Sequence, residues 1–285
     1  MRLCRFDDDR LGLVDDETVY DVTVVLNALP RHRWPLPIGD DLIRHLDRLR
    51  PAIAEAARDA RAQPLESVSL RSPVANPSKI VAAPVNYQRH LDEATADRGL
   101  HQGNVIRPIQ NVGLFLKAVS SLAGGGDEIA LRFPDRRTDH EIELAVVIGR
   151  EADRVSRESA LGYVAGYSIG LDLSVRGPEE RSMRKSVDGY SVLGPVIVTA
   201  DELKDPGGLD MSLSIDGETR QRSNTRHMIY DVPQLIALAS SFYTLHPGDI
   251  IMTGTPEGVG PIVPGNRLVA EIEAIGRLAF ELAAG

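Results

Sequence analysis

The chain has little of three features that mark particular classes of protein. Its single cysteine, Cys4, excludes an intrachain disulfide and fits a reducing cytoplasm, which is the location we expect. Aromatic residues make up 5% of the 285 residues, and the net charge is −9. Without a basic stripe interleaved with aromatic side chains, nucleic acid is not an expected partner. No apolar run approaches the ~20 residues of a membrane-spanning helix, so no membrane partner is expected either.

Strand-like segments outnumber helical ones and do not alternate regularly with them. This indicates an α+β fold rather than a doubly wound parallel sheet. We expect a small N-terminal domain over residues 1–72 and a larger domain over residues 73–285. In the small domain, a helix begins near Asp40, Pro51 breaks or restarts it, and an Ala-rich second helix runs to Ala62.

Two local patterns in the larger domain are specific. Residues 211–222 predict a hairpin with a tight turn at Asp216-Gly217. Asp231 is placed to cap a helix that has Pro233 in its first turn. Further strands are expected in apolar segments at residues 80–82, 114–117, 166–173, 195–198 and, around Ile275-Gly276, 268–282.

Residues 139–149 have the alternation and β-branched content of one strand, which ends at Gly149. Glu141 and Glu143 project to the same face of such a strand, and His140 to the other. Two neighbouring carboxylates on an apolar strand call for a cation, and a divalent metal is one candidate. The alternative is a solvated strand face that carries two acids.

Asp172 lies in a second apolar strand segment, where an unpaired buried charge would cost several kcal/mol, roughly. It either forms hydrogen bonds with a serine, with Arg176 or with a backbone amide, or it meets Glu141 and Glu143. Three carboxylates would form an oxygen-only site, which Mg²⁺, Mn²⁺ or Ca²⁺ prefers, whereas zinc would need His or Cys ligands. His140 is expected to be structural and not a ligand.

A candidate general base follows Asn86, which can cap a short helix. His90 and Glu93 are three residues apart and share one helix face. A carboxylate on one imidazole nitrogen makes the other nitrogen more basic, which suits a general base. The alternative is a surface ion pair.

Three further groups can bind a substrate anion. The segment 252–260 is a strand that runs into a Gly-rich turn, Gly254 and Thr255 included, whose amides and hydroxyls can hold a carboxylate. Lys117 ends an apolar strand, and Lys185 precedes another. Either lysine can place a cation against a substrate carboxylate or oxyanion. A surface position is the ordinary alternative, more so for Lys185 than for Lys117.

Taken in this order, the segments resemble the fumarylacetoacetate hydrolase family over roughly residues 80 to 275. The matching motifs are Asn86-Tyr87 with His90 and Glu93; Phe115-Leu116-Lys117; Glu141-x-Glu143 followed by Leu144 to Gly149; Asp172-x-Ser174-x-Arg176; Lys185-Ser186-x-Asp188-Gly189; Leu193-Gly194-Pro195; Asn224-Thr225 with Met228-Ile229; and Gly248 to Pro256. Each motif is weak singly, but the ordered set is specific.

The resemblance implies a β-rich roll or sandwich of mixed sheets as the catalytic domain, and a homodimer. It implies Mg²⁺ or Mn²⁺, with Ca²⁺ as a further candidate, held by Glu141, Glu143 and Asp172. It also implies that His90 and Glu93 lie on a lid that orders over a small 2-oxo or 2,4-dioxo acid.

The resemblance further implies that Lys185 contacts the substrate. Substrate contacts are also expected for Lys117, Arg176, Gly254 and Thr255. One departure is the segment after Arg176, where Gly177 to Glu180 lacks a glutamine that often touches substrate in the family. Such changes, and the long polar stretch from Glu93 to Pro108, affect the substrate's identity more than the metal site.

The expected reaction is hydrolysis of a carbon–carbon bond in a 2,4-dioxo acid of the acylpyruvate or fumarylpyruvate type, or in a 2,4-dioxo sugar acid. This places the enzyme in aromatic or sugar acid catabolism. The metal stabilises an enolate leaving group, and His90, oriented by Glu93, deprotonates the attacking water. Oxaloacetate decarboxylation or isomerisation of a muconate-type acid would use the same site. A non-catalytic protein that binds a metal or ligand is the alternative from another class.

Overall fold

The computed structural model describes residues 1–103 and 105–285. Its largest sheet has twelve strands. Its strand order is β4 (Ala62–Pro64), β3 (Thr18–Asp21), β2 (Arg10–Asp15), β1 (Arg2–Phe6), β14 (Ser191–Thr199), β12 (Val164–Asp172), β11 (Ile142–Ile148), β17 (Ile250–Met252), β6 (Ile80–Ala82) and β7 (Phe115–Lys117). Two short strands pair off this path, β5 (Leu70–Arg71) with β1 and β8 (Leu122–Ala123) with β14.

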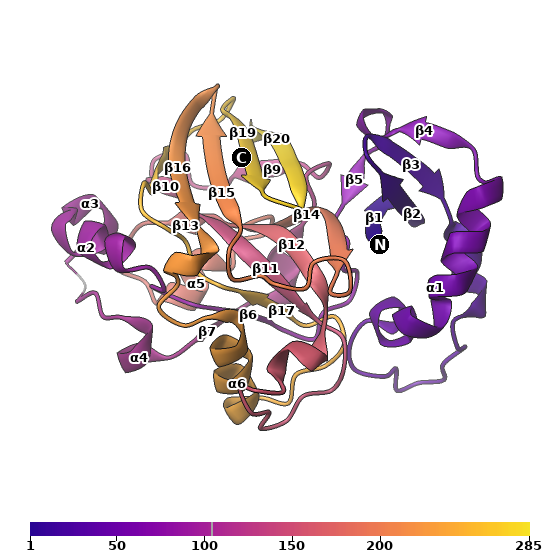
Figure 1. Ribbon diagram of the computed structural model, residues 1–285. Coiled ribbons are helices and arrows are strands. Elements are labelled where there is room, and N and C mark those ends of the chain that lie inside the picture. Colours follow the sequence, from indigo (N-terminus) through magenta and orange to yellow (C-terminus); the bar gives the residue numbers. More distant parts are fainter. Residues whose placement is uncertain (104) are drawn as a thin grey trace.

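Two smaller sheets complete the β structure. One has the order β13 (Ser174–Val175), β10 (Thr138–His140), β18 (Gly260–Ile262). The other has the order β16 (Glu218–Asn224), β15 (Asp210–Ile215), β19 (Arg267–Ile272), β20 (Gly276–Ala284), β9 (Ile129–Leu131). Figure 1 shows the last sheet lying over the centre of the largest one, so the larger part of the chain is a sandwich of mixed sheets.

The helices are fewer and mostly short. They are α1 (Asp41–Asp59), α2 (Gln88–Ala96), α3 (Arg98–His101), α4 (Ile109–Val112), α5 (Arg181–Lys185) and α6 (Val232–Phe242), together with the 3₁₀ turns η1 (Thr23–Ala28), η2 (Leu65–Ser67), η3 (Val119–Ser121), η4 (Ala160–Tyr163) and η5 (Thr225–His227). The prediction of an α+β, strand-rich fold is therefore confirmed. None of the helices in the described part of the chain is long and apolar enough to cross a membrane.

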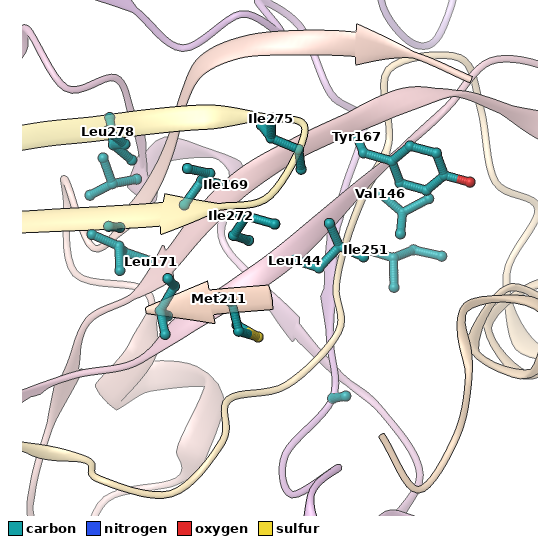
Figure 2. Close-up of a cluster of buried hydrophobic side chains, with 14 of the residues drawn as sticks. Leu144, Val146, Tyr167, Ile169, Leu171, Met211, Ile251, Ile272, Ile275 and Leu278 are labelled. Atoms are coloured by element: carbon teal, nitrogen blue, oxygen red, sulfur yellow. The ribbon is translucent and has the colours of Figure 1, made fainter. Parts of the chain in front are cut away.

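The main core fills the space between the centre of the largest sheet and the sheet that contains β19 and β20. In Figure 2, side chains from β11 and β12 point toward side chains from β15, β19 and β20. Leu144 and Ile169 from the first sheet and Met211 and Ile272 from the second are all buried there. Alternation along each strand places these apolar residues on one face, which explains the sandwich.

The other face of β11 is buried as well. Ala145 and Val147 pack in a second cluster with residues of β6 and β17. Strands buried on both faces have near-continuous apolar runs rather than alternation of apolar and polar residues, as the sequence of β11 shows. Glu143 is the one ionisable residue in this buried apolar run.

Residues 139–149 were predicted to form one strand, and this is wrong. The chain leaves the small sheet after β10, passes Glu141 and enters the largest sheet as β11. The neighbouring strand changes sheets in the opposite direction. It leaves the largest sheet after β12, passes Leu173 and enters the small sheet as β13. The backbone N–H of Asp172 donates to the carbonyl of Glu141 at 2.9 Å, so the two strands change sheets together. This corner brings residues from both strands to one point.

The N-terminal part continues the largest sheet through the antiparallel pairing of β1 with β14 (Figure 1). The helix predicted to break at Pro51 is instead continuous from Asp41 to Asp59, with Pro51 inside it. Ile43, Leu46, Leu49 and Ile53 form a buried stripe that spans the proline, and this packing outweighs the lost backbone hydrogen bond. The boundary between residues 72 and 73 stays a prediction.

The two specific local patterns are confirmed. The β15–β16 hairpin turns at Asp216 and Gly217, which both have positive φ, 52° and 83°. The Asp231 carboxylate accepts a hydrogen bond from the N–H of Gln234 at 2.9 Å, and the Gln234 side chain accepts one from the N–H of Asp231 at 3.1 Å. This capping box starts α6.

Candidate metal centre and active site

The corner between the sheets gathers three carboxylates. Glu141, Glu143 and Asp172 each offer one oxygen, and these oxygens lie within 4.8 Å of one another. Their side chains are buried, with 4%, 1% and 1% of each residue exposed, respectively. The alternative of a solvated strand face with two acids is therefore wrong, because both Glu141 and Glu143 are buried.

Three cationic side chains contact two of these carboxylates. Lys185 Nζ donates to Glu141 Oε2 at 2.6 Å and to Asp172 Oδ2 at 2.7 Å. Lys117 pairs with the other oxygen of Asp172, and Arg176 Nη2 lies 2.8 Å from Glu141 Oε1. Lys117 and Lys185 are 3% and 5% exposed, so the ordinary expectation of surface lysines is wrong for both.

The two glutamates differ electrostatically. Burial opposes the charge of Glu141, but Lys185 and Arg176 outweigh it and hold the pKa of this carboxyl well below its ordinary value. Burial and the negative charge of Asp172 raise the pKa of Glu143 well above its ordinary value. Glu143 accepts only the backbone N–H of Gly254, at 2.7 Å, among the described residues. Glu143 is thus the carboxylate that most lacks a compensating cation.

A hard divalent cation fits this cluster. All three donors are carboxylate oxygens, which is the ligand chemistry of Mg²⁺, Mn²⁺ and Ca²⁺. A cation between them would also compensate Glu143, the acid that the lysines do not reach. The imidazole of His140 is engaged elsewhere, because its Nδ1 lies 3.0 Å from Gln221 Oε1, so the site does not have the donors that zinc prefers.

Formal charges near the cluster balance without a metal. Asp139, Glu141, Glu143 and Asp172 are equal in number to Lys117, Lys185, Arg176 and Arg137, although Glu143 forms no ion pair with any of these cations. Asp139 is fully buried and holds Arg176 Nε and Arg137 Nε, each at 2.7 Å. A divalent cation would leave this group with an excess of two positive charges. A dianionic ligand, such as a carboxylate joined to an enolate, would neutralise them.

The predicted His–Glu pair forms on α2. His90 Nδ1 lies 3.1 Å from Glu93 Oε2, and the other oxygen of Glu93 accepts the N–H of Gly258 at 2.9 Å. His90 is 5% exposed, so the alternative of a surface ion pair is wrong. Because Glu93 occupies Nδ1, the Nε2 atom is the one available to the cavity that His90 lines.

Asn86 does not cap the helix, because the N-cap of α2 is Tyr87. Its side chain instead accepts the N–H of Tyr230 at 2.7 Å and donates to the carbonyls of Tyr230 and Thr253 at 2.9 and 2.8 Å. These bonds satisfy a fully buried amide and tie the start of α2 to the strand end that carries Gly254.

The Gly-rich turn after β17 contacts the carboxylate of Glu143. Gly254 has φ 94° and places its N–H on Glu143, and a Cβ there would lie 2.7 Å from Asn86 Cβ. Thr255 is buried and its Oγ1 accepts from Gln221 Nε2 at 2.8 Å, so its own hydroxyl proton can be donated. The turn is therefore built from backbone and hydroxyl donors.

Gln221 is a residue that the sequence analysis missed. It is fully buried on β16, accepts from the N–H of Ile142 at 3.1 Å, and donates to Thr255 and to the carbonyl of Pro256. It thus joins the hairpin to the start of β11 and to the Gly-rich turn. Nothing in its sequence neighbourhood, two flanking arginines in a polar hairpin, distinguishes it.

A cavity of about 360 Å³ opens beside the carboxylates, and four of the ten predicted site residues line it. These four are His90, Glu141, Arg176 and Lys185. Five further predicted residues are buried but are not among those that line the cavity: Glu143, Asp172, Gly254, Thr255 and Lys117, which pairs with Asp172.

Residues of the predicted lid also line the cavity, among them Leu100, His101 and Ile106. Asn104, within the same predicted lid, lies outside the described residues. Two arginines of α5, Arg181 and Arg184, complete the wall, and the sequence analysis did not single them out. The Gly177 to Glu180 segment, recognised as a departure from the family pattern, leads directly into this helix.

Residues 79–283 match the family that is described as Fumarylacetoacetate (FAA) hydrolase C-terminal. This range includes every residue of the carboxylate cluster, the His–Glu pair and the cavity wall described above.

Two named enzymes are similar to this protein over most of its length. The maleylpyruvate hydrolase of Aquipseudomonas alcaligenes is 55% identical over 284 residues, which is 99% of each chain. The mitochondrial oxaloacetate tautomerase Fahd2a of Rattus norvegicus is 34% identical over 251 residues, or 82% of this chain and 77% of the relative.

A solved structure is similar over the full length. It is the maleylpyruvate hydrolase from Sphingobium sp. SYK-6 in complex with manganese(II) ion and pyruvate, with a TM-score of 0.83, 42% sequence identity and 100% of both chains covered. That complex contains a divalent metal and a 2-oxo acid, the two kinds of ligand for which the charges of the present site are suited.

Proposed function

Because the chain belongs to the fumarylacetoacetate hydrolase family, we propose that it is a metal-dependent hydrolase that cleaves maleylpyruvate into maleate and pyruvate. It is an enzyme of the class that hydrolyses carbon–carbon bonds in ketonic substances. The observation that carries the proposal is one cavity lined both by Glu141 of the carboxylate cluster and by His90 of the His–Glu pair.

Glu141, Glu143 and Asp172 are proposed to hold Mn²⁺ or Mg²⁺, for which an oxygen-only donor set is suited. When bound, such an ion supplies a Lewis acid that polarises the 2-oxo group and favours the enolate form of the pyruvyl half. The similarity to a maleylpyruvate hydrolase with bound manganese and pyruvate favours Mn²⁺. Titration of the metal-free protein with each ion, followed by metal analysis, compares the two.

His90 is proposed to take the proton from the attacking water at Nε2. Glu93 accepts Nδ1–H and so fixes the ring orientation and the tautomer that leaves Nε2 as the acceptor. Because Glu93 also holds the N–H of Gly258, the position of α2 is linked to the loop that follows β17. The water oxygen then bonds to the acyl carbon, and the bond from that carbon to the pyruvyl CH₂ breaks with its electron pair passing to the pyruvyl enolate. The proton held by His90 returns to that CH₂, which gives maleate and pyruvate.

The remaining predicted residues are proposed to bind substrate oxygens. Lys185 and Arg176 are on the cavity wall and place positive charge next to Glu141, where the pyruvyl end would lie. The hydroxyl of Thr255 and the backbone around Gly254 are proposed to receive the pyruvyl carboxylate. Lys117 is buried against Asp172 and is proposed to hold this metal-binding carboxylate in place, so it contributes its positive charge to the substrate only at longer range.

A His–Glu pair favours hydrolysis over decarboxylation, because loss of CO₂ from a chelated 2-oxo acid requires no activated water. Liquid chromatography of reactions with maleylpyruvate, oxaloacetate and a muconate-type dioxo acid tests this, with Mn²⁺ and with EDTA. We expect equimolar pyruvate and maleate from maleylpyruvate, dependent on metal. The proposal is rejected if maleylpyruvate is not cleaved, or if cleavage proceeds undiminished in EDTA when metal analysis finds no bound ion.

A homodimer and a cytoplasmic location are part of the same proposal. The first is supported by the family resemblance and the second by the lone buried cysteine. Size-exclusion chromatography with light scattering tests the dimer, and cell fractionation tests the location.

A further inference from the structure

The wall of the cavity that is formed by α5 carries two guanidinium groups. Arg181 and Arg184 are three residues apart, so they lie one above the other on the same side of the helix, and both line the cavity. Met183, on the opposite side, is 71% exposed. The helix packs against β7 and β13, the strands that adjoin the carboxylate cluster (Figure 1).

Arg184 is held by neutral acceptors. Its Nε donates to the carbonyl of Glu179 at 2.8 Å, and its Nη1 donates to the carbonyl of Val175 at 3.1 Å. The guanidinium of Arg181 lies over the Phe115 ring, 5.6 Å from its centroid. Within residues 1–103 and 105–285, no carboxylate forms an ion pair with either arginine. Their orientation is fixed, but their charge is not neutralised.

The nearest acids are engaged with other groups. Glu179 forms a two-pronged pair with Arg136, at 3.0 and 2.7 Å, and Glu180 accepts the N–H of Ser182 at 2.6 Å at the start of α5. Burial accordingly lowers the pKa of Arg181. Burial, together with the charges of Arg176 and Arg181, lowers the pKa of Arg184. An anion between the two arginines would relieve this cost, and planar guanidinium groups match a carboxylate well.

We propose that Arg181 and Arg184 bind a second carboxylate at the acyl end of the substrate, so that the enzyme selects acylpyruvates that are dicarboxylic acids. The inference rests on the proposed function, which places the pyruvyl end at Glu141, Glu143 and Asp172.

The distance between the two ends has an upper limit. Lys185 Nζ, which marks the carboxylate cluster, lies 5.8 Å from the centroid of the same Phe115 ring that Arg181 approaches to 5.6 Å. The two cations therefore lie no farther apart than these two distances together. This upper limit is short enough for one small dicarboxylic acylpyruvate to reach both cations.

The test compares two substrates on matched variants. For the Mn²⁺-loaded enzyme, kcat/KM is measured with maleylpyruvate, which has a distal carboxylate, and with acetylpyruvate, which ends in a methyl group. R181Q and R184Q should each lower kcat/KM for maleylpyruvate by about 10- to 100-fold, because a charge-assisted hydrogen bond is lost, and should change kcat/KM for acetylpyruvate by less than about 3-fold. M183Q, a surface change on the same helix, should alter neither value.

Equal losses on both substrates would assign the arginines a structural or general catalytic role and overturn the proposal, as would unchanged kcat/KM for maleylpyruvate. A binding measurement separates this failure from failure of the proposed function. With Mn²⁺ and pyruvate at saturation, calorimetry should show maleate binding at least about 10-fold tighter than isocrotonate, which has one carboxylate fewer, and R181Q should abolish the difference. Equal affinities in the wild-type protein would reject the dicarboxylate site, whether or not any acylpyruvate is cleaved.

Discussion

Lys185 Nζ lies 2.6 Å from Glu141 Oε2, although the two residues are 44 positions apart in the chain. The same ammonium reaches Asp172 at 2.7 Å and the hydroxyl of Ser174 at 2.6 Å, so one lysine joins the sheet corner to the short helix α5. The contact links the proposed metal ligands to the cavity wall, and its energetic consequences can be measured.

Lys185→Met should destabilise the metal-free protein. Removing one partner of a buried ion pair leaves uncompensated carboxylates, at a cost of about 3–5 kcal/mol. Urea denaturation in EDTA should show this loss, and Mn²⁺ should restore more stability to the variant than to the wild type, because the ion compensates the same carboxylates. Lys204→Met, at an exposed lysine, serves as the control and should be neutral. An unchanged unfolding midpoint for Lys185→Met would contradict the ion-pair argument.

His90→Gln should lower kcat by about 10²- to 10⁴-fold, because the proposed general base is lost. Glu93→Gln should cost less and should shift the pH profile of kcat, because the imidazole stays in place without its carboxylate partner. The neighbouring Asp92, which is exposed on the same helix, provides the matched control Asp92→Asn. Steady-state kinetics at several pH values distinguishes the three variants. Full activity in His90→Gln would remove His90 from the mechanism.

Metal binding should raise thermal stability. A ligand that binds only the folded state at about 100 times its Kd adds about 2.7 kcal/mol. Differential scanning calorimetry with EDTA and with Mn²⁺ measures the rise in Tm, which should disappear in Asp172→Asn. Arg277→Gln, which alters an exposed arginine on β20, should retain the full rise. A rise that persists in Asp172→Asn would locate the ion elsewhere.

Cys4 should be unreactive in the folded protein, because burial raises the pKa of its thiol from 9.0 to about 12. A pKa that is higher in the folded state stabilises the protein below the pKa of the unfolded thiol. That contribution is therefore complete below about pH 9 and declines as pH rises toward 12. The free energy of unfolding should fall less steeply over this range in Cys4→Ala than in the wild type. Rapid labelling of the native thiol by a disulfide reagent at pH 8 would contradict the burial.

Several features were predictable because they depend on residues that are near one another in sequence. The β15–β16 turn needs Asp216-Gly217 for its positive φ angles, and the first turn of α6 needs the side chain of Asp231. His90 and Glu93 share a helix face by spacing alone. The choice of hard-cation chemistry likewise followed from carboxylates that appear in strands that are otherwise apolar.

Other features were not predictable, because they depend on contacts between distant segments. Pro51 remains inside α1 since a buried stripe on either side of it packs against the N-terminal strands β1 and β2. Gln221 acquires its importance only when the hairpin lies against Ile142 and Thr255. The side of α5 that faces the cavity, and so the exposure of Arg181 and Arg184 to a ligand, is set by packing against β7 and β13.

The amino-acid sequence by itself thus determined the chemical inventory of the site: three carboxylates, an imidazole with its acid, and the lysines that accompany them. Only the tertiary structure decided their arrangement. The corner at Glu141 changes the sheet in which the chain runs and brings the carboxylates against the buried lysines, whereas packing of α5 on β7 and β13 turns its arginines toward the same cavity. The physical reason is that local patterning fixes which face of an element is apolar, whereas burial and charge compensation depend on which other element covers that face.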